Sequence, residues 1–267
     1  MKARAHIVVT ADGRGGSRLA VLRGEPPLLA RRTGPRGADI GVHLVGGAAG
    51  PLGGDELELE VEVGPGAALR VATVAASIAL PGATGRPSVL SVHATVGEGG
   101  RLDWLPEPLI AAAGCDHRAE STVELAAGAR LVWREELVCG RHGEDGGDVG
   151  LDTSVRLGGR PLHRHELTVG PREPAWISPA VLGAARAFGS LLIVDPAWID
   201  GPAPAPAHHT DATATAARMP LAGPAVLVSA VGAHAGPVRT ALSALAPLCA
   251  DHELRGSTHR REATFSS

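Results

Sequence analysis

The amino-acid sequence predicts a mainly β protein with a repeated antiparallel or solenoid-like core and a small helical portion in its C-terminal half. Three observations predict this fold class. A seven-residue phrase with a central glycine occurs three times, between runs of alternating polarity. The clearest run, residues 56–63, places four glutamates opposite four aliphatic side chains. With 36 glycines, 21 prolines and only 2% aromatic residues among 267, the composition favours short strands and turns.

The repeated phrase indicates stacked strand–turn–strand units. It reads Val-Gly-Pro-Gly-Ala-Ala-Leu, then Val-Gly-Glu-Gly-Gly-Arg-Leu, then Leu-Ala-Ala-Gly-Ala-Arg-Leu, with equivalent glycines at Gly66, Gly99 and Gly128. These glycines stand 33 and then 29 residues apart. Glycine suits a tight turn that needs positive φ. One such unit cannot bury its own apolar face, so neighbouring units must stack.

Alternating or apolar runs predict the strands, in chain order, at residues 6–10, 18–22, 28–32, 39–45, 56–63, 69–77, 88–96, 129–139, 149–157, 161–169, 191–194, 213–219 and 225–231. Residues 149–157 and 161–169 form an expected hairpin around Gly158-Gly159. Pro106 and Pro108 lack the amide hydrogen that a central strand requires, so we expect a bulge or a sheet edge before residues 109–113.

Two helices are expected in the C-terminal half. Ser178 followed by Pro179 is typical of a helix start, which predicts a short helix over residues 178–188. Aliphatic residues on one face predict a second helix over residues 237–248. Residues 200–209 read as a Pro/Ala loop, and the tail after Arg255 as frayed. The whole chain, 1–267, is interpreted as one domain: β-rich over 1–175, helix-containing over 176–255 and frayed over 256–267.

Composition narrows the classes of function. A formal net charge of −3 and a pI near 6.5 argue against a general nucleic-acid or membrane-surface binder. The N-terminus has no long apolar segment typical of a signal peptide, and no run of about 18 apolar residues suggests a membrane span. Cys115, Cys139 and Cys249 are odd in number and widely spaced, so no disulfide framework is expected. A cytoplasmic protein is the simplest interpretation.

A few residues are candidates for chemistry. His163 and His165 share a face of a predicted strand, a geometry that metal sites use, although paired surface or interface histidines explain them as well. Cys115 and His117 offer a possible transient metal contact or, less simply, a nucleophile pair without an orienting group. Glu135 falls in the apolar row of its strand, which would raise the pKa of its carboxyl unless it lies near the strand end or pairs with an arginine.

None of the familiar phosphate-binding, dinucleotide-binding, nucleophile-elbow or zinc-protease motifs occurs in the sequence. The residues by themselves therefore indicate a β scaffold without a recognisable catalytic centre. Two alternatives stay open: a metal-dependent β-fold enzyme using His163 and His165, and a β-solenoid binding module. The scarcity of aromatic residues argues against sugar stacking by such a module.

Several landmarks in order resemble the family of the urease accessory protein UreD, also called UreH. They are Gly-Pro-Leu-Gly-Gly-Asp-Glu-Leu at 50–57, Val-Glu-Val-Gly-Pro-Gly-Ala at 61–67, Leu-Asp-Trp-Leu-Pro-Glu at 102–107, Gly-Ala-Arg-Leu at 128–131 and Gly-Arg-His-Gly-Glu at 140–144. The likeness covers residues 40–165 best, and residues 225–248 more loosely. Two departures occur: Ala-Ala-Ser-Ile-Ala at 75–79 replaces the family's Ala-Thr-Lys-Val-Tyr, and Pro106 stands where the family has Gln.

The resemblance implies a β-rich, helicoid-like scaffold without catalytic activity. Such a protein would bind apo-urease and a complex of UreF with the GTPase UreG, and would assist nickel delivery to the urease centre through an internal channel. No tightly bound cofactor is implied, because a conduit needs weak, exchangeable ligands for transient nickel. Asp55, Glu107, Arg141 and Glu144 match family landmarks and are the implied functional positions. Glu135 joins them from the strand pattern alone.

Overall fold

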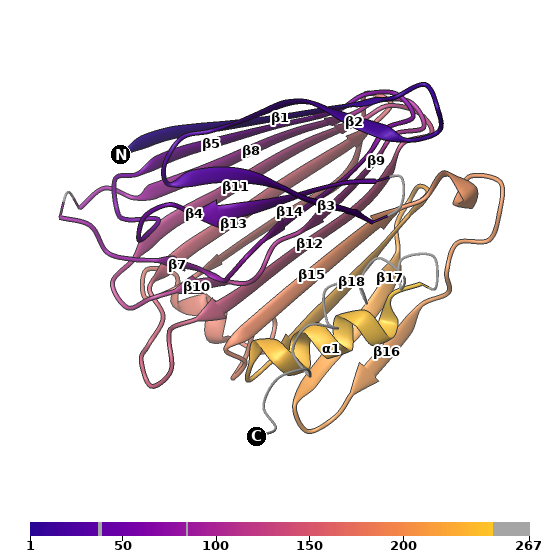
Figure 1. Ribbon diagram of the computed structural model, residues 1–267. Helices are drawn as coiled ribbons and strands as arrows, with labels where there is room; N and C mark the ends of the chain where they lie inside the picture. Colours follow the sequence, from indigo (N-terminus) through magenta and orange to yellow (C-terminus); the bar gives the residue numbers. More distant parts are fainter. Residues whose placement is uncertain (37–38, 84, 248–267) are drawn as a thin grey trace, which may run out of the picture.

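The computed structural model describes residues 1–36, 39–83 and 85–247, which form two facing sheets of seven and eleven strands (Figure 1). The first sheet, sheet A, has the order β14 (Arg160–Val169), β13 (Asp148–Leu157), β11 (Asp116–Leu125), β8 (Ser88–Val96), β5 (Glu56–Val63), β1 (Lys2–Ala11) and β2 (Ser17–Gly24).

The second sheet, sheet B, has the order β16 (Ala207–Thr210), β17 (Ala214–Pro220), β18 (Ala225–Gly232), β15 (Ala187–Val194), β12 (Arg130–Cys139), β9 (Arg101–Leu105), β6 (Ala68–Thr73), β4 (Asp39–Gly46) and β3 (Leu28–Arg36). Two short strands, β7 (Ser77–Ala79) and β10 (Leu109–Ala111), pair with each other, and β10 also pairs with β12.

The repeats form a two-sheet solenoid. Of the two arrangements expected for the core, antiparallel or solenoid-like, the structure has the solenoid-like one. Each unit runs along a strand of sheet A, turns, returns along sheet B, and then enters sheet A again. Strands β1, β5, β8, β11 and β13 therefore pair in parallel, as do β4, β6, β9 and β12. Antiparallel pairing belongs to the hairpins and added strands at the two ends.

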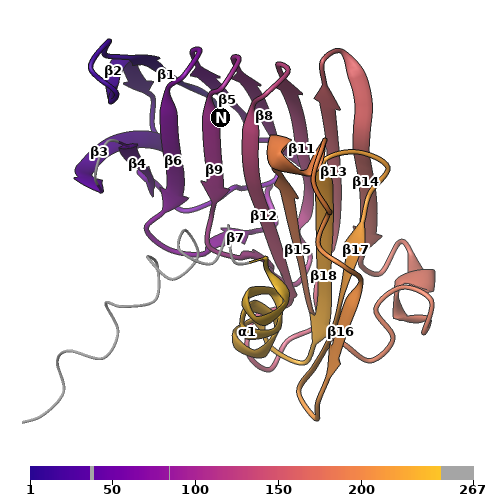
Figure 2. The same ribbon diagram turned by 90° about the vertical axis from the view of Figure 1, so that its right-hand side faces the viewer.

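The repeated glycines make the turns between the sheets. Gly66, Gly99 and Gly128 have φ of 64°, 63° and 76°, a left-handed conformation that glycine adopts without steric cost. Successive turns also bond to each other, since the Gly97 amide donates to the carbonyl of Val63 at 2.7 Å. Figure 2 shows these turns gathered at one end of the molecule. The repeat seen in the sequence is therefore the structural repeat.

Alternation along each strand fills the space between the sheets. In β5 the four aliphatic residues are buried, and the four glutamates lie on the outer face of sheet A, as predicted. One apolar cluster joins both sheets near the glycine turns, and another fills the opposite end of the interior. The expected break at Pro106 and Pro108 is present: the chain leaves the sheet between β9 and β10, and β12 pairs with both of these strands.

The prediction of a helix over residues 178–188 is wrong. A short 3₁₀ helix, η1 (Pro174–Ile177), precedes Ser178, whose φ and ψ of −70° and 151° are extended. Gly183 has φ of 58°, and Ala187 already begins β15. All eight residues of β15 are buried between neighbouring strands or under a helix, so sheet pairing overrides the local helical preference.

The C-terminal strands widen sheet B, and one helix covers its outer face. A second 3₁₀ helix, η2 (Pro196–Trp198), follows β15. Residues 207–209 of the expected loop belong instead to β16. Helix α1 (Ala235–Leu245) confirms the predicted second helix and packs its apolar face on β15, β17 and β18 (Figures 1 and 2). The predicted end of this helix at Leu248 and the tail after Arg255 lie outside the described residues.

Helix α1 is too short to cross a membrane, and no other helix of the described residues is long and apolar enough to do so.

Candidate functional site

A band of polar side chains crosses the interior between the two apolar clusters. Its members face inward from five strands of the two sheets: Ser121, Glu135, Thr153, His165 and Ser190. They lie at one level, because Thr153 pairs with both Ser121 and His165 in sheet A, and Glu135 pairs with Ser190 in sheet B. We call these five residues the polar band. On β12, Leu131 and Trp133 lie in the cluster on one side of it, and Leu137 in the cluster on the other.

Glu135 is the one acidic residue of the polar band. Thr153 Oγ1 donates a hydrogen bond of 2.6 Å to Glu135 Oε1, and this bond joins β13 of sheet A to β12 of sheet B. Burial raises the pKa of the Glu135 carboxyl, and the Thr153 and Trp133 side chains only partly oppose the shift. The raised pKa confirms the expectation from the strand pattern. Glu135 lies in mid-strand and bonds to a threonine, so neither alternative explanation, a strand end or an arginine partner, applies.

The raised pKa of Glu135 predicts a pH dependence of stability. Above the ordinary glutamate pKa of about 4.3 the unfolded chain loses this proton while the folded chain keeps it. Stability therefore falls as pH rises from that value through the raised pKa. The Glu135→Gln variant lacks the titrating carboxyl and therefore this loss of stability. It should be more stable than the wild type at pH 7.5 and lose that advantage at pH 5. Urea unfolding at both values measures the difference.

Glu120→Gln is the matched control for this prediction, because Glu120 is exposed on β11, on the outer face of sheet A. It should leave the pH dependence of the wild type intact. A difference between Glu135→Gln and the wild type that is the same at pH 5 and pH 7.5 would refute the assignment of a raised pKa to Glu135.

His165 is the member of the polar band that lies on the edge strand β14. His163 lies two residues before it, on the same face of the strand. Their ring centroids are 6.3 Å apart and the rings lie 13° from parallel, while His165 also stacks on Phe188 at 5.4 Å. Burial lowers the pKa of both histidines, so they favour the neutral form that binds metals. His165 Nδ1 is buried without a hydrogen-bond partner. Metal binding by this pair stays a prediction.

Cys115 is buried just before β11, and His117 is buried at the start of that strand. Burial and the nearby carboxylates of Asp148, Asp116 and Glu144 raise the pKa of the Cys115 thiol to about 11, so it is protonated at neutral pH and unsuited to nucleophilic attack. Burial lowers the pKa of His117 to about 4, and its Nδ1 lies 2.9 Å from Ser88 Oγ. Metal contact by these two residues also stays a prediction.

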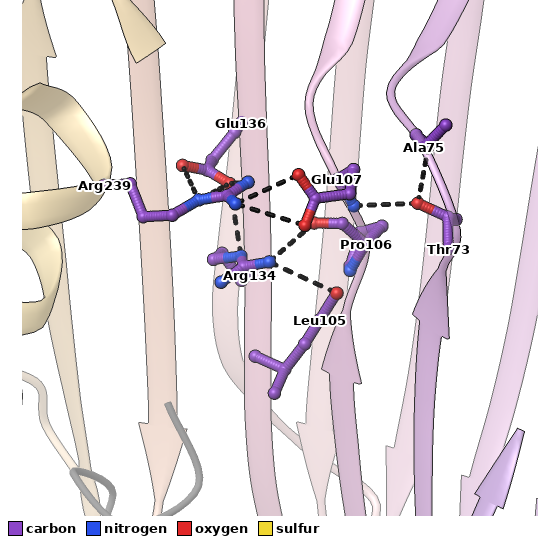
Figure 3. A network of polar contacts seen from close by, with 8 residues as sticks. All are labelled: Thr73, Ala75, Leu105, Pro106, Glu107, Arg134, Glu136 and Arg239. Carbon is purple, nitrogen blue, oxygen red and sulfur yellow. Dashed lines mark hydrogen bonds and ion pairs between the residues drawn. The ribbon is translucent and has the colours of Figure 1, made fainter. Parts of the chain in front are cut away.

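A second polar cluster lies on the outer face of sheet B, under α1 (Figure 3). Arg239 of α1 binds two carboxylates, since its Nη1 is 3.0 Å from Glu107 Oε2 and its Nε is 3.0 Å from Glu136 Oε2. Arg134 Nε lies 3.2 Å from the same Glu136 oxygen. We call Glu107, Arg134, Glu136 and Arg239 the outer ion cluster. It fixes the helix to the sheet.

The outer ion cluster also supports the break between β9 and β10. Arg134 Nη2 donates to the carbonyls of Leu105 and Pro106, at 3.2 and 2.8 Å, just past the last residue pair between β9 and β12. The Glu107 amide donates to Thr73 Oγ1 at 2.9 Å. Sequence reasoning found Glu107 but missed Glu136 and Arg239. Arg134 and Glu136 stand two residues apart and therefore lie on the same face of β12. Their opposite charges on one face of a strand are the signal that could have found part of the cluster.

The remaining predicted positions lie in loops that lead from sheet B back to sheet A. Asp55 is buried and accepts hydrogen bonds from the Met1 ammonium at 2.7 Å and the Leu52 amide at 2.9 Å. Arg141 and Glu144 pair with each other, with Nε to Oε1 at 2.8 Å. Hydrogen bonds from Arg141 lower the pKa of Glu144 to about 2. The structure thus distributes the family landmarks and Glu135 over loops, the outer face and the interior, and does not join them in one site.

Comparison with known proteins gives a consistent result over nearly the whole chain. A family model described as "UreD urease accessory protein" matches residues 1–264. A "Urease accessory protein UreD" from Parafrankia sp. (strain EAN1pec) is 44% identical over 268 residues, covering 92% of this chain and 88% of that protein. A "Urease accessory protein UreD 3" from Streptomyces griseus is 47% identical over 239 residues, covering 88% and 91%. A "Urease accessory protein UreD" from Streptomyces coelicolor is 44% identical over 250 residues, covering 93% and 97%.

Proposed function

Because the chain belongs to the UreD family of urease accessory proteins, we propose that it is a non-catalytic scaffold that assists nickel delivery to urease. In this role it binds apo-urease together with a complex of UreF and UreG, in the cytoplasm. Nickel is a transient cargo, and the protein holds no tight cofactor. The observation that carries the proposal is the match to urease accessory proteins over about nine-tenths of both chains.

The polar band supports the nickel part of the proposal. The carboxylate of Glu135, the Thr153 hydroxyl and the imidazole of His165 are oxygen and nitrogen ligands placed inside an otherwise apolar interior. Carboxylate oxygen and imidazole nitrogen are ligands that divalent nickel accepts, and the five residues of the polar band include no thiol that would hold the ion tightly. Burial raises the pKa of the Glu135 carboxyl, so a proton competes with the cation for it, which makes metal binding weaker and reversible.

Co-expression of the urease subunits, UreF and UreG with and without this chain tests the scaffold role. We expect the partners to co-purify with the chain, and urease activity after nickel addition to depend on its presence. Activity that is the same without the chain, or a chain that co-purifies with none of the partners, would refute the proposal.

A variant separates the scaffold role from nickel delivery. Glu135→Gln keeps the size and the hydrogen-bond acceptor of the side chain but cannot become an anion. It should retain the partners and lower urease activation at least severalfold, whereas Glu120→Gln on the outer face should activate as the wild type does. Full activation by a folded Glu135→Gln variant would remove the polar band from the proposed nickel route.

A further inference from the structure

The outer face of sheet A carries a ladder of cross-strand ion pairs between β1 and β5. Lys2 Nζ lies 2.6 Å from Glu56 Oε2, and Arg4 Nε lies 2.8 Å from Glu58 Oε2. Parallel register places residue 2 beside 56, 4 beside 58 and 6 beside 60. At the third step the residue on β1 is His6, so an imidazole stands where the first two steps have a lysine and an arginine.

His6 contacts two carboxylates at this step. Its Nε2 lies 2.7 Å from Glu62 Oε1 and 3.9 Å from Glu60 Oε2. One ligand atom from each of the three side chains lies within 4.8 Å of the other two. Among the ion pairs of the described residues, neither glutamate has a lysine or arginine partner. Two carboxylates therefore share one imidazole.

The register adds a second imidazole to the same place. Glu60 pairs with His93 of β8, so His6, Glu60 and His93 lie side by side on three adjacent strands. Adjacent strands are about 4.8 Å apart, and the three side chains leave the same face of the sheet. His93 is exposed, and Glu62 also lines a hollow of about 340 Å³ that opens to solvent beside the glycine turns.

We propose that His6, Glu60 and Glu62 form a surface site for a borderline divalent cation such as Ni²⁺ or Zn²⁺, with His93 as a further ligand. Imidazole and carboxylate are ligands that such ions accept, and the excess negative charge favours a cation over a neutral ligand. The partial exposure of all the ligands leaves coordination positions for water, so the ion exchanges readily. This site lies on the outer face of sheet A and is separate from the polar band, and it does not depend on the role in urease maturation.

Equilibrium dialysis of the full chain against NiCl₂ at pH 7.5 tests the site. His6→Ala and the double variant Glu60→Gln/Glu62→Gln should each lose one bound ion, with affinity for that ion weakened more than about tenfold, since even outer-shell changes cost about 10–100-fold. His93→Ala should weaken it by less. Glu58→Gln is the matched control, because Glu58 lies on the same strand and face but pairs with Arg4. It should bind as the wild type does.

A second measurement locates the ion directly. Substoichiometric Ni²⁺ is paramagnetic and should broaden the imidazole signals of His6 and His93 in nitrogen-15 spectra before those of His208, which lies on β16. An unchanged number and affinity of bound ions in His6→Ala, or an unaffected His6 signal, would overturn the proposal. Urease activation is not measured here, so failure of the scaffold role and failure of this site give different results.

Discussion

Glu136→Ala is expected to destabilise the protein by about 3–5 kcal/mol, because it removes the carboxylate that two arginines share beneath α1. The Arg134 side chain is only 3% exposed, so the variant leaves a buried cation without its nearest counter-charge. Arg239 also loses one of its two partners, which loosens the contact between α1 and β12. Urea unfolding gives the free energy, and hydrogen exchange over residues 235–245 reports the docking of the helix.

The charge left without a partner, more than the lost contact, should dominate this effect. Arg134→Met/Glu136→Met removes both buried charges and leaves Arg239 paired with Glu107, so it should be less destabilising than Glu136→Ala alone. Arg164→Ala breaks an exposed ion pair with Asp152 on the outer face of sheet A and should change stability much less. A Glu136→Ala variant within about 1 kcal/mol of the wild type would contradict the buried role of the outer ion cluster.

Trp133→Ala should cost about 3–5 kcal/mol, the range for deleting a large buried side chain. Trp133 is 2% exposed in the centre of β12, and its ring stacks on that of Trp104 with centroids 5.0 Å apart. These two rings join neighbouring units of the solenoid inside the cluster nearest the glycine turns. Thermal and urea unfolding of the folded variant measure the loss.

Trp133→Phe provides the graded comparison. It keeps an aromatic ring facing Trp104 and leaves a smaller cavity, so its loss of stability should be clearly below that of the alanine variant. Equal effects of the two substitutions would mean that the ring contributes no packing, and would contradict the buried stack.

Local patterns predicted the repeated part of the fold closely. Residues 56–63 and 88–96 are strands with the bounds that alternation gave, because each exposes one face and buries the other. The prediction of a helix that ends at residue 188 was wrong for the opposite reason. Strand β15 is buried on both faces, so it shows no alternation, and the Ser178–Pro179 pair before it resembles a helix start. Pairing with β12 and β18 determines its structure, and no local signal carries that information.

The polar band was only half predictable. Glu135 could be found, because the period of its own strand places a carboxylate in an apolar row. Its partner Thr153 could not, because the stacking of the two sheets decides which strands face each other. The outer ion cluster shows the same limit, since Glu136 and Arg239 are 103 positions apart in the chain. Local reasoning identifies single unusual residues, and the fold determines which of them meet.

The antiparallel hairpins at the two ends of the solenoid have a consequence for self-association. Identical parallel units could in principle continue from one molecule into the next, as strands do in a fibril. In sheet A the last parallel strand is followed by β14, which runs the other way, and the first is flanked by the reversed β2. Both of these outermost strands carry exposed charged residues: Arg18 and Arg23 on β2, and Arg160, Arg164 and Glu166 on β14. Reversed direction and exposed charge at both edges therefore oppose the continuation of sheet A from one molecule into the next.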